Sequence, residues 1–413
     1  MTEQPQASST LDQFRRYFWQ PPRAHGDVIE DRSVTFLELF YDLVYVVVIA
    51  QAAHHLAEHV SWRGAAEFAV VFGLIWIAWL NGTLYHDLHG RTDGRTRTFV
   101  AVQMGLLALL GVFTSGATGV DGPAFAVVYT AYLLVLTWLW YTVQRQDDER
   151  FLPFTHRFLF GMVVSVVVIG ASAFLDDDAR IVVWALFVTG WLVGIVVLQA
   201  ITGGMARLGF DISDSLVERF GLFTIIVLGE VVVGVVAGMS DGDRSAIAIA
   251  TGMLGLAIGF AYWWTYFDFV GGRRVTMSNR AHTTWMIGHF PITLGIAATG
   301  AAMVSLVHHA EDSSTPQPTA WLLTGSIAVA LVALALVTTA LLDSRRLPQV
   351  FGPLRWAMAL SALVALGFGW LRPAPWILAL SLWVVLSILW FYAILRWVKC
   401  TDPEERVPTL ADG

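Results

Sequence analysis

Residues 216–239 read LVERFGLFTIIVLGEVVVGVVAGM, a run in which only Glu218, Arg219 and Glu230 are charged. The hydrocarbon core of a bilayer is about 30 Å thick, and a helix crosses it with roughly 20 mostly apolar residues. Irregular backbone exposed to lipid would leave its polar groups unpaired, so a run of this kind is expected to be helical. The stretch therefore predicts a membrane-spanning helix.

The rest of the chain repeats this pattern. Of its 413 residues, 56% are hydrophobic and only 14% are charged, whereas soluble proteins usually carry about 25% charged residues. The net charge of −7 provides no basic surface for a nucleic acid. These values exclude a soluble enzyme, a disordered protein and a nucleic-acid binder, and they predict an all-α integral membrane protein whose main partner is the lipid bilayer. The twelve expected spans cover residues 34–57, 65–87, 97–118, 123–143, 156–175, 180–201, 216–239, 245–270, 282–308, 319–342, 351–371 and 375–397.

The basic residues support this count, because they should gather on the cytoplasmic side of a membrane protein. The two tails and the loops after even-numbered spans contain 21 of the 25 basic residues, and the other side has only Arg63, Arg180, Arg244 and Arg372. We therefore expect both termini, residues 1–33 and 399–413, to be cytoplasmic tails. The N-terminal tail has no signal-peptide pattern, although its Leu11, Phe14 and Phe18 have the spacing of a short amphipathic helix.

Two short matches indicate an internal repeat between residues 34–201 and 202–398. Residues 38–40 align with 218–220, and residues 85–90 align with 266–271. Six spans in each half would make two parallel six-helix repeats related by an axis along the membrane normal. Interfacial residues at span ends would explain the same matches without a repeat. The charged residues within these matches, Glu218, Arg219, Asp87 and Asp268, are candidate site residues of second rank.

Glu230 is the most conspicuous buried acid, because it lies deep in the seventh span between apolar segments. Ionisable groups inside a span are costly and mark ion or proton pathways. We interpret Glu230 as a group that exchanges a proton or binds a cation. A permanently protonated carboxyl that joins two helices is the alternative.

The first span carries Glu38, Asp42 and Tyr45 on one face of the helix. Two acids four residues apart repel each other unless a cation or an arginine lies between them. The pair therefore indicates either a vestibule that attracts cations or a structural network with arginines such as Arg32, Arg95 and Arg219.

Histidines suggest two further places. His54 and His55, with Glu58 and His59, lie near the other end of the first span, where they form either a metal site or pH-sensitive gate, or ordinary interfacial histidines. The metal signal is weak, and we predict neither a metal nor a cofactor.

His289 lies deeper in the ninth span, two residues before Pro291, which removes a helix hydrogen bond. Asn81 and Gln103 lie at a comparable depth and are expected to line the same cavity. A histidine satisfied by a neighbouring helix is the other interpretation of His289. The sequence has no catalytic motif, and we predict no enzyme activity.

The run TFLELFYDLVYV at residues 35–46, with Gln51 and His54-His55-Leu56, resembles the opening signature of the bacterial low temperature requirement protein A (LtrA) family. ERFGLFTIIVLGE at residues 218–230 and Tyr266-x-Asp268 resemble its later motifs. A histidine common in the second signature is Ser215 here. The resemblance implies a polytopic protein of the bacterial inner membrane, linked by the family's name to growth in the cold, and implies no mechanism. Residues 40–42 are also similar to the Phe-Ser-Asp element of a six-plus-six-span potassium channel family.

These patterns lead to three functional hypotheses. The first is a transporter of a cation or of a proton-coupled small solute, with Glu230 as the titrating group and Glu38, Asp42, Tyr45, Asn81 and His289 along the path. The second is an ion channel. The third is a membrane protein that does not transport but senses or organises lipids in the cold.

Overall fold

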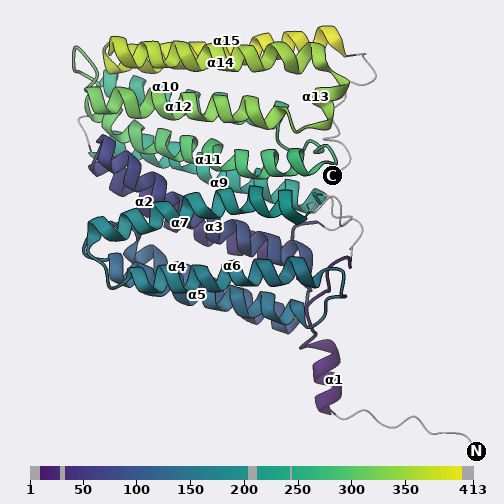
Figure 1. Ribbon diagram of the computed structural model, residues 1–413. Helices are drawn as coiled ribbons and strands as arrows, with labels where there is room; N and C mark the ends of the chain where they lie inside the picture. Colours follow the sequence, from purple (N-terminus) through teal and green to yellow (C-terminus); the bar gives the residue numbers. More distant parts are fainter. Residues whose placement is uncertain (1–9, 28–32, 203–211, 242–243, 402–413) are drawn as a thin grey trace, which may run out of the picture. The chain divides into compact units, whose positions relative to one another are not determined.

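The computed structural model describes residues 10–27, 33–202, 212–241 and 244–401, and this part of the chain is built from helices (Figure 1). Twelve of its helices are long and apolar enough to cross a membrane, which confirms the all-helical, twelve-span prediction. The spans are α2 (Phe36–Glu58), α3 (Trp62–His89), α4 (Gly94–Thr114), α5 (Gly122–Gln144), α6 (Leu152–Ser172), α7 (Asp177–Thr202), α9 (Asp214–Asp241), α10 (Ala246–Phe269), α11 (Asn279–His308), α12 (Gln317–Thr338), α14 (Pro348–Leu371) and α15 (Pro375–Cys400). Two short helices are α1 (Thr10–Tyr17) and α13 (Leu342–Arg346).

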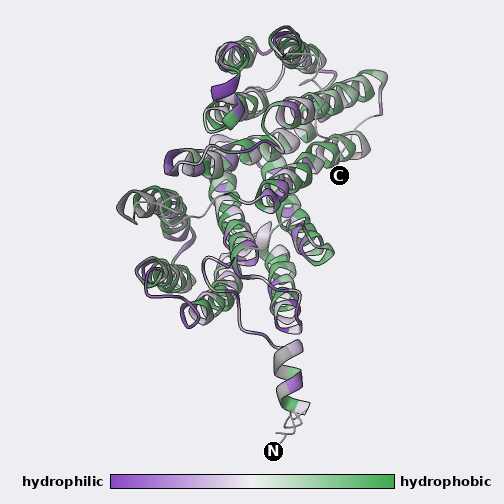
Figure 2. Ribbon diagram, turned by 90° about the vertical axis from the view of Figure 1, so that its right-hand side faces the viewer, coloured by the Kyte–Doolittle hydropathy of each residue, from purple (hydrophilic) through white to green (hydrophobic). Residues whose placement is uncertain are grey.

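Local sequence sets where these helices begin. Asp93, Ser245 and Ser278 cap α4, α10 and α11, because each side chain accepts a hydrogen bond from the backbone N–H three residues later. Proline occupies the first turn of α5, α6, α12, α14 and α15, where its missing N–H costs nothing. Figure 2 shows hydrophobic residues along the long helices and hydrophilic residues mainly at their ends and in the connections.

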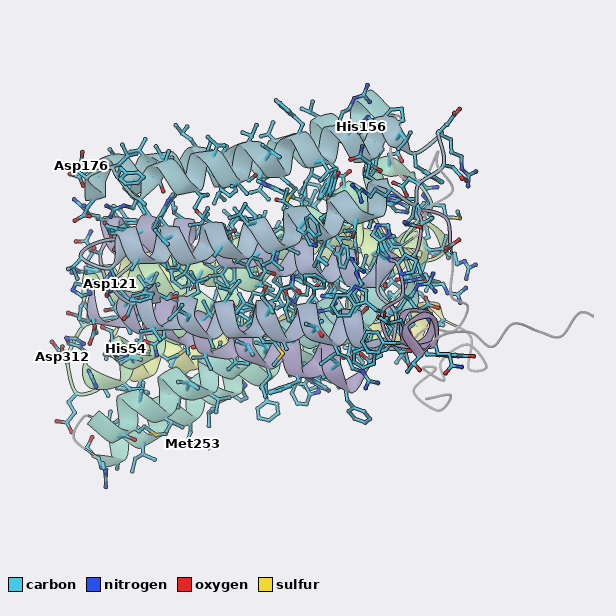
Figure 3. All side chains as sticks on the ribbon, turned by 90° about the horizontal axis from the view of Figure 1, so that it is seen from below. His54, Asp121, His156, Asp176, Met253 and Asp312 are labelled. Carbon is cyan, nitrogen blue, oxygen red and sulfur yellow. The ribbon has the colours of Figure 1, made fainter. Side chains whose placement is uncertain are left out.

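The chain forms two compact units. Unit 1 contains Met1–Val48 and Ile75–Phe187, and unit 2 contains Ile49–Leu74 and Val188–Gly413. Residues 49–74 therefore belong with the second half of the chain, although they precede most of the first half in sequence. Figure 3 shows Asp121 and Asp176 at one end of the unit 1 helices and His156 at the other end. The internal repeat stays a prediction.

A segment between α1 and residue 27 is tied to unit 1 by hydrogen bonds. Arg23 donates from Nη2 to the carbonyl oxygen of Asp87 (2.6 Å) and from Nε to that of Gly90 (2.9 Å). His89 donates from Nδ1 to the carbonyl oxygen of Arg23 (2.8 Å). This part of the N-terminal tail is thus folded against the ends of the helices of unit 1, an arrangement that its polar composition did not indicate.

Asp147, in the loop between α5 and α6, anchors the same segment. Its carboxylate accepts hydrogen bonds from the Nδ1 of His25 (2.8 Å to either oxygen), from the backbone N–H of His25 (3.0 Å) and from the hydroxyl of Thr155 (2.6 Å). Burial alone would raise the pKa of Asp147, but these hydrogen bonds outweigh it and hold the pKa below its ordinary value. The carboxylate form is therefore the one that the fold stabilises.

This geometry predicts a pH-dependent stability. Because the pKa of Asp147 is lower in the folded protein, its contribution is complete above the ordinary carboxyl pKa and is lost as the pH falls through the lowered value, below about pH 4. We expect Asp147→Asn to cost about 1–3 kcal/mol at neutral pH. Thermal unfolding of the purified protein, followed from neutral to acidic pH, should show the difference between the two proteins shrinking as the pH falls. A constant difference would contradict this role of the charge.

Candidate functional site

Unit 1 has a buried cluster of three tyrosine hydroxyls. Tyr41 and Tyr45 on α2 lie 2.5 and 3.0 Å from the hydroxyl of Tyr132 on α5, and 3.1 Å from each other. Tyr132 also donates to the carbonyl oxygen of Ala78 on α3 (3.1 Å). Because Tyr132 uses its hydroxyl proton for the bond to Ala78, it accepts hydrogen bonds from the hydroxyls of Tyr41 and Tyr45. Each of the three hydroxyl protons therefore has an acceptor. We call these three residues the tyrosine cluster.

A glycine on α3 makes room for the tyrosine cluster. A Cβ atom at Gly82 would lie 2.2 Å from the hydroxyl oxygen of Tyr41 and 3.1 Å from that of Tyr132. Non-bonded atoms do not approach to 2.2 Å, so any side chain at this position would displace Tyr41. Glycine is required at position 82 because the hydroxyl of Tyr41 lies so close to the backbone of α3.

Three other polar residues predicted from the sequence lie in the interior of unit 1, on α2, α3 and α4. Asp42, which is fully buried, accepts a hydrogen bond from Nε1 of Trp79 (3.0 Å). Gln103 accepts one from Nε2 of His86 (3.2 Å). Asn81 donates to the carbonyl oxygen of Ile77 (2.9 Å). In the described part of the chain, Oδ1 of Asn81 and Nε2 of Gln103 have no hydrogen-bond partner. Unit 1 therefore contains a buried polar interior with spare donor and acceptor capacity.

Glu38 has a local role at the first turn of α2. Its Oε2 accepts from the backbone N–H (2.9 Å) and the hydroxyl (3.0 Å) of Thr35, and that hydroxyl accepts from the N–H of Glu38 (3.3 Å). This is a capping box, which satisfies the free N–H groups at a helix start. Asp87, near the end of α3, is buried and takes part through its carbonyl oxygen in the tether of Arg23.

Unit 2 contains Glu230, in the interior of α9. It is 3% exposed, and its Oε1 has no hydrogen-bond partner among the described residues. The backbones of α9 and α11 are in contact at this level, because a Cβ at Gly300 would lie 2.5 Å from the carbonyl oxygen of Glu230, and one at Gly234 would lie 2.0 Å from that of Gly300. The carboxyl thus lies where two helices cross closely.

His289 on α11 is satisfied by its neighbours. Its Nδ1 donates to the carbonyl oxygen of Trp285 (2.7 Å), which leaves Nε2 to accept from the hydroxyl of Tyr266 on α10 (2.9 Å). Its ring also contacts Phe220, which lies ten residues before Glu230 on α9. Ten helical residues rise about 15 Å, so Glu230 and His289 lie at different depths of the same helix pair.

A chain of hydroxyls links three helices of unit 2. The hydroxyl of Thr299 on α11 lies 3.3 Å from that of Tyr262 on α10 and 2.9 Å from that of Ser326 on α12. Thr299 is the residue before Gly300, which contacts the backbone of Glu230, so these three hydroxyls lie at the depth of Glu230. No local sequence pattern indicates these contacts, since threonine and serine in apolar runs usually bond only to their own helix.

The other second-rank residues lie near the ends of helices. Asp268 accepts at Oδ2 from Nε1 of Trp390 (2.6 Å), and so joins α10 to α15. Arg219 is fully buried in the first turns of α9, and its neighbour Glu218 is exposed. The contact with Trp390 indicates a structural role for Asp268, and among the described residues of unit 2 Glu230 is the acid in the interior of a span.

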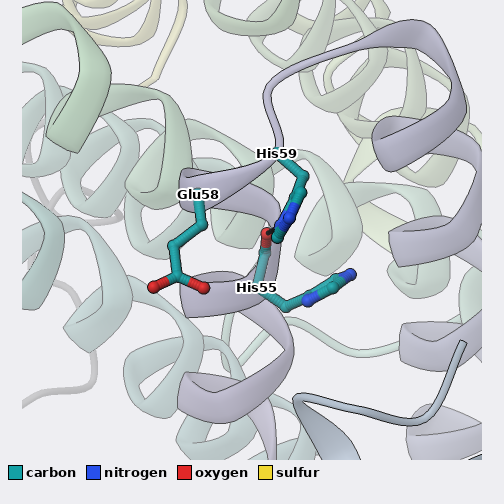
Figure 4. Close-up of side chains that lie close together, drawn as sticks. All are labelled: His55, Glu58 and His59. Carbon is teal, nitrogen blue, oxygen red and sulfur yellow. Dashed lines mark hydrogen bonds between the residues drawn. The ribbon is translucent and has the colours of Figure 1, made fainter. Parts of the chain in front are cut away.

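Unit 2 also has an apolar pocket and a histidine cluster. The pocket, with a volume of about 240 Å³, lies between the start of α3, α11 and α12. Its walls include Trp62, Phe68, Trp321 and Ser326. At the end of α2, the ligand atoms of His55, Glu58 and His59 lie within 4.8 Å of one another (Figure 4). His54, 65% exposed, lies 3.3 Å from Glu58.

Two comparisons relate the chain to known proteins. Residues 33–390 match the family described as bacterial low temperature requirement A protein (LtrA). The chain is also similar to an uncharacterized protein of Rhizobium meliloti (strain 1021), with 25% identity over 297 residues, which cover 68% of this chain and 71% of the relative.

Proposed function

This chain belongs to the bacterial low temperature requirement A protein family, and from that premise we propose that it transports a cation, or a small solute coupled to protons, across the bacterial inner membrane. The observation that carries the proposal is Glu230, an acid inside a membrane-spanning helix that has an unpartnered oxygen. Burial of a carboxyl oxygen without a partner lowers the stability of the fold, and ionisable groups placed inside spans at such a cost mark ion or proton pathways. We propose that a proton or a cation is exchanged at that oxygen.

The polar interior of unit 1 supports the same proposal. Asp42, Tyr45, Asn81 and Gln103 are buried within helices that span the membrane. Oxygen atoms of hydroxyl, amide and carboxylate groups replace the water shell of a cation as it leaves bulk solvent. In this proposal, Glu38 and Asp42 lie in the cytoplasmic half of α2, as the distribution of arginines predicts, and both chain termini lie on that side of the membrane.

Reconstitution tests whether the protein transports at all. We expect proteoliposomes with the purified protein to dissipate an imposed pH gradient, or to take up one of a panel of monovalent and divalent cations, faster than protein-free liposomes. A pH-sensitive dye and isotope uptake measure the two cases. Saturable exchange favours a transporter, and unitary current steps in a planar bilayer would favour the channel instead. No movement of any ion by folded protein would contradict both.

The apolar pocket of unit 2 favours a second candidate function, in which the protein binds lipid. Its walls come from three membrane-spanning helices and are almost entirely apolar, and it extends along α12 from Pro318 to Val329, about 16 Å of helix. These properties fit one acyl chain of a bilayer lipid. The packing of such an acyl chain against the walls of the pocket would change as the membrane stiffens in the cold.

Gly325 provides a test of this second candidate. It lines the pocket, and a Cβ there would meet nothing within 4 Å. Gly325→Phe should therefore fill the pocket and reduce labelling of α12 by a photoactivatable phospholipid several-fold. Gly367→Phe, on α14 and equally open, is the matched control. Equal labelling of the two variants and the unmodified protein would contradict lipid binding in the pocket.

A further inference from the structure

We propose that His55, Glu58 and His59, at the end of α2, form a binding site for a divalent transition-metal ion of the zinc class. The residues read His-Leu-Ala-Glu-His, so the two histidines are four residues apart and the glutamate lies between them. In a helix this spacing directs all three side chains to one side within about 100°. Their ligand atoms lie within 4.8 Å of one another.

The distances fit a site that closes on its ion. Zinc binds imidazole nitrogen and carboxylate oxygen at about 2.0–2.2 Å, so two ligand atoms on one ion lie no more than about 4.2 Å apart. Glu58 and His59 are exposed and His55 is half-buried, and small side-chain rotations would bring the three groups to that separation. No helix needs to move, because all three residues are on the same two turns.

A hydrogen bond to the backbone orients the ring of His59 for metal binding. Its Nδ1 donates to the carbonyl oxygen of His55 (3.1 Å), which leaves the lone pair of Nε2 for the ion. Metal-binding histidines commonly donate their second ring nitrogen in this way, which fixes the tautomer and orients the ring. On the other side of the cluster, Nε2 of His54 lies 3.3 Å from Oε1 of Glu58.

The chemistry of the donors selects the ion. Two imidazoles and one carboxylate suit zinc, copper and nickel, whereas magnesium and calcium prefer sites made of oxygen alone. Three protein ligands leave at least one coordination position for water or another ligand. Glu67 on α3 also acts electrostatically on His55, and its own carboxylate accepts a hydrogen bond from Nε of Arg63 (2.7 Å). The site lies among the predicted extracytoplasmic connections of the spans, and the neighbouring His54 lies at the same end of unit 2 as Asp312 (Figure 3).

Calorimetric titration with zinc chloride tests the site directly. The full-length protein, purified without a histidine tag, should bind one Zn²⁺ per chain. His55→Ala with His59→Ala should weaken this binding about 100-fold or more, and Glu58→Gln should weaken it about tenfold. The control is His156→Ala with His308→Ala, which removes two exposed histidines outside the cluster and should leave binding unchanged.

The outcomes separate cleanly. Thermal unfolding of each variant shows whether it is folded. Glu58 and His59 are exposed and His55 is half-buried, so we expect these substitutions to leave the fold intact. Binding that the control variant retains and the cluster variant loses supports the site. The absence of zinc binding by the unmodified protein, or equal binding by both double variants, would overturn it. Because no ion gradient is used, this result does not depend on whether the protein transports.

Discussion

Gly234→Ala is expected to lower the stability of the protein by about 1–3 kcal/mol or more, the usual cost of forcing extra atoms into a packed interior. The added Cβ would lie 2.0 Å from the carbonyl oxygen of Gly300. Backbone atoms cannot rotate away as a long side chain can, so α9 and α11 would have to separate at the level of Glu230. Thermal unfolding of the purified protein in detergent measures the effect.

Gly229→Ala is the matched control for this prediction. It is on the same helix, five residues earlier, and a Cβ there meets nothing within 4 Å. Alanine also favours the helix more than glycine does, so this variant should be as stable as the unmodified protein or slightly more stable. Equal unfolding temperatures for the two variants would show that α9 and α11 do not approach as closely as described.

Gly82→Ala is expected to have a comparable effect in unit 1. Its Cβ would lie 2.2 Å from the hydroxyl oxygen of Tyr41, so Tyr41 must move and break its hydrogen bonds to Tyr45 and Tyr132. Buried hydroxyls that lose their partners cost about 1–3 kcal/mol. The unfolding temperature should fall accordingly, whereas Gly105→Ala in α4, where a Cβ meets nothing, should not lower it.

A second substitution separates the steric cause from a general intolerance of change in α3. Tyr41→Phe removes the oxygen that Gly82→Ala strikes, and the next atoms would then be 3.1 Å from the new Cβ. The double variant should therefore recover part of the stability that Gly82→Ala loses. Full additivity of the two single losses would argue against the described contact.

The span pattern could be predicted because membrane helices follow a local rule. Each run of about 20 apolar residues must be helical wherever it packs, and all twelve predicted runs are spans. The division into two units could not be predicted from the sequence, because it depends on which helices contact each other. Residues 49–74 contact the second half of the chain, and no local pattern in them indicates it.

The candidate residues were predictable as buried polar groups, but their partners were not. Asp42 and Gln103 are buried as expected, whereas Trp79 and His86, which bond to them, needed the contacts between helices. Tyr132 in an apolar run gave no signal. Glu38 could have been assigned from the sequence, since Thr35 three residues earlier completes a capping-box pattern.

In unit 2, the hydrogen-bond partners of His289 became visible only with the structure. Trp285 and Tyr266 bond to its two ring nitrogens, which are the contacts expected if a neighbouring helix satisfies it, and its place on a transport path stays a prediction. Glu230 is the opposite case, because its depth was evident from the sequence and its Oε1 has no hydrogen-bond partner among the described residues. The proposal of transport therefore depends mainly on Glu230.

Ion flux in proteoliposomes with Glu230→Gln beside the unmodified protein tests that proposal most directly. Glutamine has nearly the same shape but cannot ionise, so the fold should survive while the exchange of a proton or cation stops. Glu311→Gln, an exposed acid of unit 2, is the control. We predict that flux disappears in Glu230→Gln and persists in Glu311→Gln. Undiminished flux in folded Glu230→Gln would contradict the role of this acid.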